Sequence, residues 1–337
     1  MLDAAGAMAR AVELAALGPA HGPNPRVGAV ITSATGEVLG EGWHHGSGTA
    51  HAEVKAIEDA AHRGNSVQGA TAYVTLEPCA HTGRTGPCVD ALTQAGIAVV
   101  RYAVPDPNPS ARGGGQILAS RGIDARLQPW AAAAELNRTW LAAVGRGRPY
   151  VIAKWAQTLD GRSAAADGSS FWITGEQARE HAHSIRAQAD AMVVGTGTVL
   201  ADDPLLSARP NGVESAHQPL RVVMGLRDTS GQRVWRDGNA LAARTRDPAE
   251  VLTMLAELEK RTVVVEGGSV VITAFLAAGL VDEIHAYIAP ALLGEGTPAI
   301  GALGIGTMAQ ALRAQRIESV ALGADTLIRA LVADVRD

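Results

Sequence analysis

Cysteine and aromatic residues are scarce in this chain: of its 337 residues two are cysteine, and Phe, Trp and Tyr together make up 4%. Both cysteines, Cys79 and Cys88, lie in one short stretch. This placement argues against a disulfide framework and suits a reducing cytoplasm. No run reaches the roughly 18 apolar residues that span a bilayer, and the first residues lack the layout of a signal peptide. We therefore expect a cytoplasmic protein that does not bind a membrane.

An excess of positive charge is also missing, since the formal net charge is −5. A nucleic-acid-binding surface would be basic and interleaved with aromatic residues, so we expect no nucleic-acid partner. An anionic substrate would have to be held by individually placed Arg or Lys side chains.

The length favours two domains rather than one core. The composition, with 47% hydrophobic and 19% charged residues, is typical of a soluble globular protein. A Gly- and Arg-rich stretch at 145–149 is a candidate linker, so we place one domain at 1–146 and a second at 149–337. Predicted strands alternate with predicted helices in both halves, which indicates the α/β class.

The predicted elements follow from apolar periodicity. In the first half they are helices at 4–17, 51–62, 87–94 and near 113–121, and strands at 27–32, 37–43, 70–76, 97–104 and 123–127, followed by an Ala-rich helix. In the second half they are strands at 150–156, 191–199, 220–224, 262–268 and 282–290, and helices near 176–188, 248–259 and 270–278. Residues 227–247 are weakly patterned and receive no element.

Three predicted element ends carry residues that could bind one metal ion. His51 opens a helix, Cys79 follows a strand and Cys88 opens the next helix. Strand ends and helix starts on one edge of an α/β sheet point into a common crevice. One imidazole and two thiolates select zinc, and three protein ligands leave a fourth position for water.

Glu53, two residues after His51, is the candidate catalytic residue. Zinc lowers the pKa of a coordinated water molecule to about 7, and a nearby carboxylate can carry a proton from water to a ring nitrogen and then to a leaving amine. Zinc nucleobase deaminases combine H-x-E with P-C in this way, although with two residues between the cysteines rather than the eight found here. Two alternatives stay open: a structural zinc site closed by His81 or His45, and two buried free cysteines.

Seven short segments along nearly the whole chain form a recognisable series. In the first half these are NPRVG (24–28), the loop EPCAHTGRTGPC (77–88) with its eight-residue spacing, and DPNP (106–109). In the second half they are TLDG (158–161), WITG (172–175), GTGTVLADDP (195–204) and VEGG (265–268). Each segment is short, but in their order and spacing they together resemble the bifunctional deaminase–reductase family of riboflavin biosynthesis.

The resemblance implies two consecutive reactions. The first is zinc-dependent hydrolytic deamination of 2,5-diamino-6-(5-phosphoribosylamino)pyrimidin-4(3H)-one to 5-amino-6-(5-phosphoribosylamino)uracil, and the second is reduction of the ribosyl group to ribityl by NADPH. It also implies a cytidine-deaminase-like three-layer α/β/α domain followed by a dihydrofolate-reductase-like α/β domain. We accordingly expect two cofactors, one Zn²⁺ per chain and NADPH, and a phosphoribosyl pyrimidine substrate. We also expect a homo-oligomer, either a dimer or a tetramer.

Site residues can be carried over onto matching positions. The resemblance implies that NADPH contacts Ala156, Trp172, Thr198, Asp202 and the segment Gly268, Ser269, Val270, Val271, Ile272, Thr273 and Ala274. It implies that the substrate contacts Asn24, His44 and Arg84 in the first domain, and Ser170, Arg186, Leu206, Arg209 and Glu266 in the second. Lys154 would act in the reductase step, hydrogen-bonding the ribose hydroxyls or the opening ring oxygen.

Several of these residues also have a purely structural interpretation. The glycines after the two predicted strands could be ordinary turns, although two such strand–Gly–helix junctions favour a dinucleotide. Arg186 and Arg209 would clamp a phosphate, or could be solvated surface residues. Lys154 could be a strand residue whose charged end reaches solvent, and Trp172 could be part of the core.

One position departs from the family pattern. Gly225 stands where an acidic residue is usual, and the segment after it is short and lacks a clear strand before the helix near 248. The adenosine end of cofactor binding, and with it the preference for NADPH over NADH, is therefore open.

Two rival functions remain. One is a single-function zinc deaminase with a non-catalytic second domain, against which the retained polar residues of that domain argue. The other is a zinc-stabilised nucleic-acid-binding or editing module, against which charge and aromatic content argue.

Overall fold

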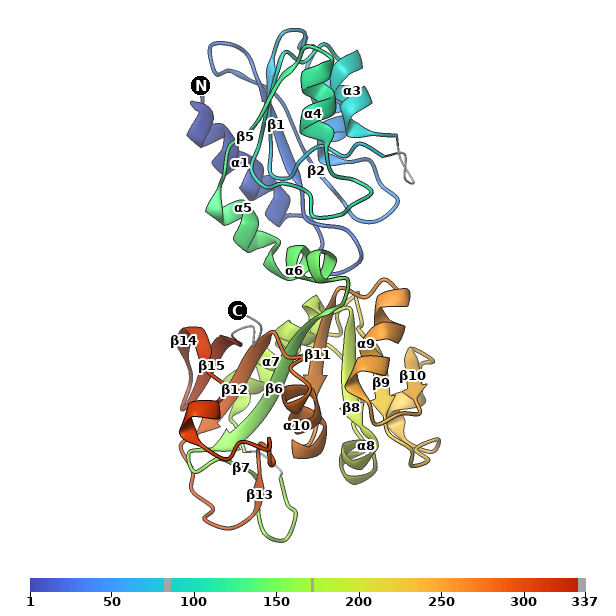
Figure 1. Ribbon diagram of the computed structural model, residues 1–337, viewed down its shortest axis with the longest axis vertical. Coiled ribbons are helices and arrows are strands. Elements are labelled where there is room, and N and C mark those ends of the chain that lie inside the picture. Colours follow the sequence, from blue (N-terminus) through green and yellow to red (C-terminus); the bar gives the residue numbers. More distant parts are fainter. Residues whose placement is uncertain (82–85, 171–172, 333–337) are drawn as a thin grey trace. The chain divides into compact units, whose positions relative to one another are not determined.

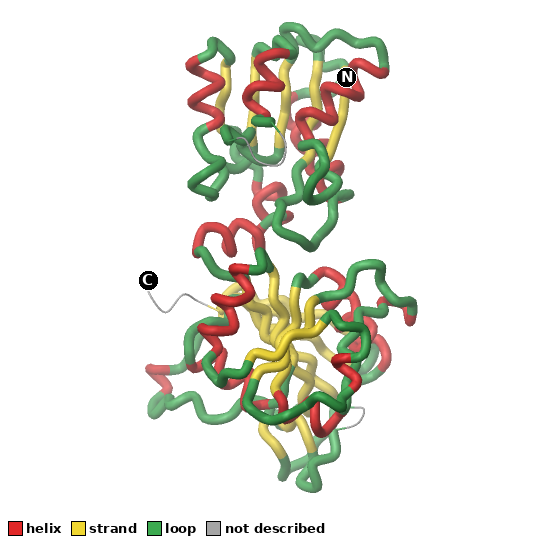
Figure 2. The backbone as a smooth tube through the Cα atoms, turned by 90° about the vertical axis from the view of Figure 1, so that its right-hand side faces the viewer, coloured by secondary structure: helices red, strands yellow, loops and turns green. Residues whose placement is uncertain are grey.

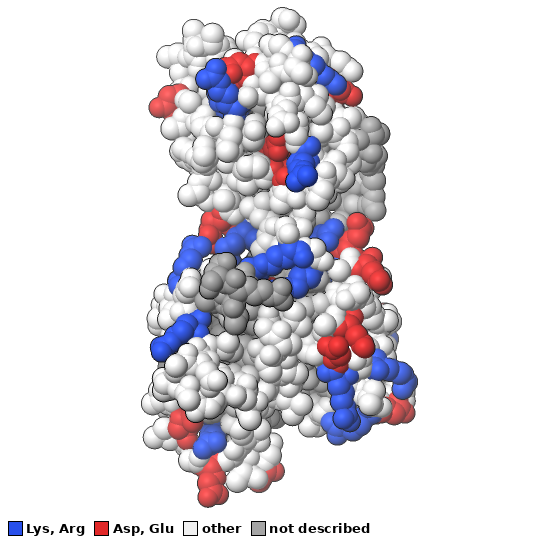
Figure 3. All heavy atoms as spheres, viewed as in Figure 1, with Lys and Arg blue, Asp and Glu red and all other residues white. Residues whose placement is uncertain are grey.

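The computed structural model describes residues 1–81, 86–170 and 173–332, and the chain divides into two units, Met1–Gly147 and Arg148–Asp337 (Figure 1). Each unit is an α/β structure, as the sequence predicts, with strands side by side and helices packed against them (Figure 2). Among the described residues, no helix has both the length and the apolar character needed to cross a membrane. Acidic and basic side chains both occur on the face of each unit that Figure 3 presents.

A five-stranded sheet in the order β2-β1-β3-β4-β5 forms the centre of the first unit. Its strands are β1 (Gly28–Thr32), β2 (Val38–Trp43), β3 (Thr71–Val74), β4 (Val99–Tyr102) and β5 (Asp124–Leu127). β1 is antiparallel to β2 and β3, whereas β3, β4 and β5 are parallel. β2 to β5 therefore run in one direction, and their carboxyl ends lie at the edge where β1 begins.

Helices cover both faces of this sheet, which gives the three expected layers. They are α1 (Ala4–Ala16), α2 (Ala52–His62), α3 (Cys88–Gln94), α4 (Gly114–Ser120), α5 (Ala131–Leu136) and α6 (Arg138–Arg146). α1 packs against Val30, and α2 packs against Ala29 and Ile31. Because successive strand residues point to opposite faces, a strand covered on both faces must bury every residue, and all five residues of β1, GAVIT, are buried.

An eight-stranded sheet in the order β10-β9-β8-β11-β6-β12-β15-β14 forms the second unit. Its strands are β6 (Tyr150–Thr158), β8 (Ala191–Gly195), β9 (Leu220–Met224), β10 (Ala240–Ala243), β11 (Thr262–Glu266), β12 (Glu283–Ala289), β14 (Ala314–Leu322) and β15 (Asp325–Val332). The first six strands in this spatial order are parallel to one another. β15 is antiparallel to β12, and β14 is antiparallel to β15. A separate pair joins β7 (Arg162–Ala164) to β13 (Thr297–Pro298).

The helices of this unit are α7 (Glu176–Gln188), α8 (Thr196–Asp202), α9 (Pro248–Glu257) and α10 (Ser269–Ala277), with short 3-10 turns η1 (Pro210–Gly212), η2 (Arg233–Trp235) and η3 (Met308–Gln310). The core contains Val151 and Val193 from the sheet together with Leu255 of α9 and Phe275 of α10. The parallel strands thus bury nearly continuous apolar runs, as strands covered on both faces do.

The structure differs from the sequence predictions at several places. The run 191–199 holds a strand only to Gly195, after which α8 begins. β10 lies in the segment expected to lack a strand before the helix near 248, and that expectation was wrong because its sequence, ALAA, carries little β-propensity. β14 and β15 were not predicted, since nearly every residue of β14 is exposed and no apolar alternation marks it.

Close packing of α1 on β1 generates the first prediction. A Cβ atom on Gly28 would lie 2.0 Å from the carbonyl oxygen of Ala11 in α1, so Gly28→Ala must push the helix away. We expect a loss of about 1–3 kcal/mol in the free energy of unfolding of this unit, measured by urea unfolding with hydrogen exchange on peptides from residues 1–147. Gly145→Ala in α6 is the control: no atom lies within 4 Å of its added Cβ, so it should not destabilise. Equal stability of the two variants would contradict this account.

Candidate active sites

The carboxyl edge of the first sheet gathers the predicted metal ligands. His51 follows β2 and immediately precedes α2, Cys79 lies in the loop after β3, and Cys88 is the first residue of α3. β2 and β3 run in the same direction on either side of β1, so the loops that leave them emerge together. The topology therefore brings together residues that are 28 and 37 positions apart in sequence.

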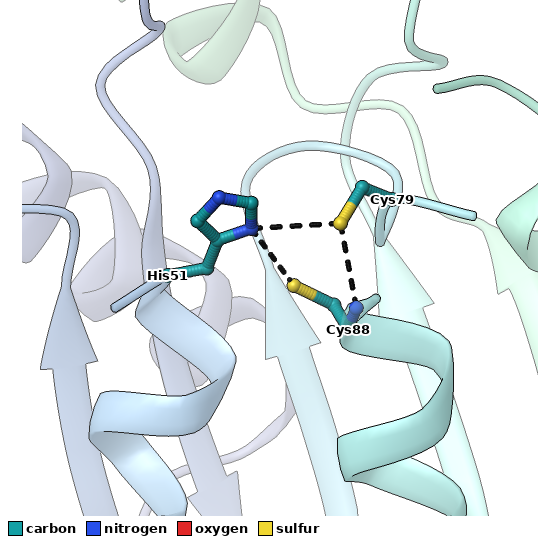
Figure 4. Close-up of side chains that lie close together, drawn as sticks. All are labelled: His51, Cys79 and Cys88. Carbon is teal, nitrogen blue, oxygen red and sulfur yellow. Dashed lines mark hydrogen bonds between the residues drawn. The ribbon is translucent and has the colours of Figure 1, made fainter. Parts of the chain in front are cut away.

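Figure 4 shows the three side chains pointing toward one another. His51 Nδ1 lies 3.1 Å from Cys88 Sγ and 3.5 Å from Cys79 Sγ, and all three donor atoms lie within 4.8 Å of one another. Zinc bonds of about 2.0 Å to nitrogen and 2.3 Å to sulfur in a tetrahedron place such donors roughly 3.5–3.8 Å apart. The donor set and its spacing thus fit one zinc ion. Among the described residues no fourth His, Cys, Asp or Glu joins this cluster.

Two features of the cluster suit metal binding and proton transfer. The Cys79 sulfur accepts hydrogen bonds from the Cys88 side chain, the His51 ring and the Cys88 backbone N–H (3.3 Å), which together lower the pKa of Cys79 to about 4. Glu53, in the first turn of α2, is 4% exposed, and burial raises the pKa of its carboxyl group. A thiolate is the form that binds zinc, and a raised pKa makes a carboxyl group a better proton acceptor, as a proton carrier requires.

Asn24 and His44, two predicted substrate residues, lie beside the cluster. Asn24 precedes β1 and His44 follows β2, so both lie at the same edge, where Asn24 Nδ2 is 2.9 Å from His44 Nε2. The His44 ring packs edge-on against that of His51, with centroids 5.4 Å apart, and burial lowers the pKa of His44. A neutral imidazole and an amide are suited to hydrogen-bonding a pyrimidine ring. Arg84, the third predicted contact, lies outside the described residues.

Sequence reasoning missed the groups that support the Cys79 loop. The buried Glu77 carboxylate accepts hydrogen bonds from the backbone N–H groups of Asp106 (3.2 Å) and Gly115 (3.0 Å). A Cβ on Gly114 would lie 1.8 Å from the carbonyl oxygen of Pro78, so this loop rests directly on the start of α4. The only signals in the sequence were the DPNP turn and the three consecutive glycines at 113–115.

The second unit has a cavity of about 1010 Å³ along the carboxyl ends of its parallel strands. Two strand–Gly–helix junctions approach each other there: a Cβ on Gly195 would lie 2.7 Å from a Val271 methyl carbon, and Gly268 N–H donates to Thr198 Oγ1 at 3.0 Å. Because Gly195 and Gly268 have no side chains, their backbone groups are open to the cavity. This volume and these exposed amide groups fit a dinucleotide.

Three charged side chains meet in this cavity. Arg186 of α7 donates to Glu266 Oε2 from Nε at 2.9 Å and to Oε1 from Nη2, and Lys154 Nζ donates to Glu266 Oε1 at 3.0 Å. Burial by itself would raise the pKa of Glu266, but Arg186 and Lys154 outweigh it and hold the pKa well below its usual range. Lys154 also lies over the ring of Tyr287, 5.3 Å from its centroid. The carboxylate therefore fixes both cations inside the cavity.

Most of the other predicted reductase residues also line the cavity. They are Ala156, Ser170, Thr198, Asp202, Leu206, Gly268, Ser269, Val270, Val271 and Ala274. Ile272 lies in the hydrophobic core, and Thr273 Oγ1 donates to the Ser269 carbonyl while accepting from Gly301 N–H. Arg209 is exposed and does not line the cavity, although it lies near enough to His183 to lower its pKa. Trp172 lies outside the described residues.

Fold and sites together define a two-domain enzyme, a zinc-dependent hydrolytic deaminase joined to an α/β reductase. The comparisons agree: residues 2–104 match the cytidine and deoxycytidylate deaminase zinc-binding region, and residues 149–328 match the RibD C-terminal domain. The chain belongs to the RibD family, the bifunctional enzymes of riboflavin biosynthesis.

Relatives match over most of their length. The riboflavin biosynthesis proteins RibD of Corynebacterium ammoniagenes and Escherichia coli are 48% and 41% identical, covering 81% and 86% of this chain and 82% and 88% of their own. Acinetobacter baumannii RibD superposes with a TM-score of 0.88 at 37% identity, covering 97% of this chain and 98% of that one. A deaminase/reductase structure from Thermotoga maritima gives 0.84 at 30% identity with the same coverage. The chain is thus a deaminase and a reductase that uses zinc and NADPH.

The geometry of the metal cluster generates the second prediction. We expect purified protein to contain one zinc per chain by mass spectrometric metal analysis, and Cys79→Ala combined with Cys88→Ala to contain almost none, because one imidazole cannot hold the ion alone. His45→Ala is the matched control, since that ring stacks on Trp43, 4.7 Å between centroids, and is not in the cluster. Full zinc retention by the double variant, or loss in His45→Ala, would show that the ligands are others.

Proposed function

We propose that residues 1–146 deaminate the diaminopyrimidine ribotide at a zinc ion held by His51, Cys79 and Cys88, with Glu53 as the proton carrier. The single observation that carries this proposal is the convergence of three donor atoms within 4.8 Å beside a buried carboxyl group. A structural zinc site would have four protein ligands, and the described residues supply three.

Deamination adds water to the ring carbon that carries the amino group and releases ammonia, so a proton must reach the departing nitrogen. When bound, zinc acidifies a water molecule and so supplies the nucleophile. Glu53 takes one proton from that water and gives it to a ring nitrogen, and then takes the second proton from the hydroxyl group of the adduct and gives it to the leaving amine. The Asn24–His44 pair holds the pyrimidine edge, and the resemblance assigns Arg84 to the same substrate.

Replacing Glu53 with Gln isolates this role. The amide keeps the size and hydrogen bonds of the side chain but cannot carry the proton, so ammonia release should fall by a factor of about 100 or more while zinc content stays at the wild-type value. Reduction of substrate that is already deaminated, followed by NADPH absorbance, should be unchanged. Normal ammonia release by Glu53→Gln would remove Glu53 from the mechanism.

We infer that residues 149–337 reduce the ribosyl group of the deaminated product with NADPH bound along the cavity. Ala156, Trp172, Thr198, Asp202 and the segment 268–274 are the proposed cofactor contacts, and Ser170, Leu206 and the Glu266 cluster are the proposed substrate contacts. Lys154 pairs with Glu266 and lies where it can hydrogen-bond the ribose hydroxyls or the opening ring oxygen. Arg186, oriented by the same carboxylate, and Arg209 supply positive charge for the phosphate.

A substitution at Arg209 tests whether the two reactions are independent. Its guanidinium has no carboxylate partner among the described residues, so it can bind a phosphate directly. A charge-assisted hydrogen bond contributes about 1.5–3 kcal/mol, and Arg209→Ala should therefore lower kcat/KM of the reductase step about 10- to 150-fold, mostly through KM. Ammonia release should continue at its normal rate. Loss of both activities in soluble, zinc-loaded protein would show that the sites depend on each other, and no change in either would make Arg209 a surface residue.

A homo-oligomer and a cytoplasmic location remain predictions. Two cysteines that must stay reduced to bind zinc support the cytoplasm. β14 supports self-association, because it is the last strand of its sheet and exposes Ile317 (63%) and Val320 (37%). Light scattering on purified protein distinguishes monomer, dimer and tetramer.

A further inference from the structure

The cavity of the second unit extends well beyond the charged cluster around Glu266. Lys154 and Glu266 lie on the neighbouring strands β6 and β11, and the lining continues past Gly195 after β8 to Arg227 after β9 and Arg246 after β10. From β6 to β10 is four strand spacings of roughly 4.8 Å, or about 19 Å. A ligand that reacts beside Lys154 and is long enough to fill the cavity therefore places its far end at the two arginines.

The side chains of Arg227 and Arg246 make no polar contact that would stabilise the fold among the described residues. Both are exposed, and neither forms an ion pair or a side-chain hydrogen bond with any described residue. The nearest acidic residues in sequence are already engaged: Asp228 accepts from Ser230 N–H and Oγ–H, and Asp247 accepts from Ala249 N–H at the start of α9. Two guanidinium groups thus face a cavity without a carboxylate to neutralise them.

Arg227 is aimed at the cofactor junction rather than into solvent. A Cβ atom built on Gly197, the second residue of α8, would lie 2.8 Å from Arg227 Nη2. The guanidinium therefore lies against the backbone of Gly197, two residues from the end of β8. Asp202, the acidic residue that lines the cavity from the same helix, is five positions further on, roughly 7.5 Å along the axis.

Gly225 explains why no carboxylate stands at the end of β9. Its φ is +131°, and an added Cβ would lie 2.6 Å from Thr196 Oγ1, so a side chain is excluded there. In dinucleotide sites an acidic residue near this place hydrogen-bonds the 2′-hydroxyl of NADH, whereas a nearby arginine accommodates the 2′-phosphate of NADPH. The strand end here carries glycine at position 225 and has the two arginines nearby.

We propose that Arg227 and Arg246 bind the 2′-phosphate of NADPH and make this enzyme prefer NADPH over NADH. The proposal rests on the cofactor site assigned above to residues 149–337. Guanidinium groups pair with phosphate through two parallel charge-assisted hydrogen bonds. NADH lacks that phosphate, so it gains nothing from either arginine.

Binding rather than turnover tests the proposal. Zinc-loaded full-length protein is titrated with NADPH and with NADH by nicotinamide fluorescence, and with adenosine 2′,5′-bisphosphate and AMP by calorimetry. Arg227→Ala combined with Arg246→Ala should raise the Kd for NADPH and for the bisphosphate about 10- to 100-fold and leave the Kd values for NADH and AMP within about 3-fold. The double Lys variant should recover part of the preference, because it keeps the charge but not the bidentate geometry.

Arg236→Ala is the matched control, an exposed arginine of the same segment that does not line the cavity; it should leave all four Kd values unchanged. An unchanged ratio of NADH to NADPH affinities in the double Ala variant overturns the proposal while leaving the cofactor site in place. A wild-type protein that binds neither nucleotide overturns the cofactor site as well.

Discussion

Parallel strands must end at a common edge of their sheet, and this constraint places both active sites. In the first unit β2 and β3 run in the same direction on either side of β1, so the residues that follow them, His51 and Cys79, meet above the start of β1. In the second unit six strands run parallel, and residues on or just beyond five of them, β10, β9, β8, β11 and β6, line one cavity. Both sites thus lie at the carboxyl ends of parallel strands, although their chemistry differs.

The two sites balance their buried charges by different means. A buried charge must be paired or must coordinate a metal ion. In the first unit His51, Cys79 and Cys88 form a cluster that could hold a metal ion, and a bound zinc would contribute positive charge beside the buried Glu53. In the second unit Glu266 is neutralised by Lys154 and Arg186, which belong to the chain itself. The charge balance of the first site would therefore involve a metal ion, whereas the second is preorganised by its own residues.

Charge is also distributed along the length of the reductase cavity. At the Glu266 end the two cations, Lys154 and Arg186, are held in place by a carboxylate. At the far end Arg227 and Arg246 line the cavity and form no ion pair with any described residue. An acidic protein with a net charge of −5 can bind anionic ligands because these few arginines are concentrated where the ligand lies rather than spread over the surface.

Sequence alone predicted the candidate zinc ligands, which the structure brings together, because imidazole and thiolate are chemically distinctive and each lies at a recognisable strand or helix end. The sequence also predicted the α/β class and a division into two domains. It predicted most of the strands of both sheets, since buried strands leave continuous apolar runs. It did not indicate β14, whose residues are exposed, or β10, whose four residues carry little β-propensity.

Only the tertiary structure decided which distant residues act together. The pairing of Asn24 with His44 depends on β1 lying beside β2, and the grouping of Lys154, Arg186 and Glu266 depends on β6, β11 and α7 meeting in one cavity. Local sequence patterns record which face or end of an element a residue occupies. They do not record strand order or direction, and it is these that set the distances between side chains far apart in the chain.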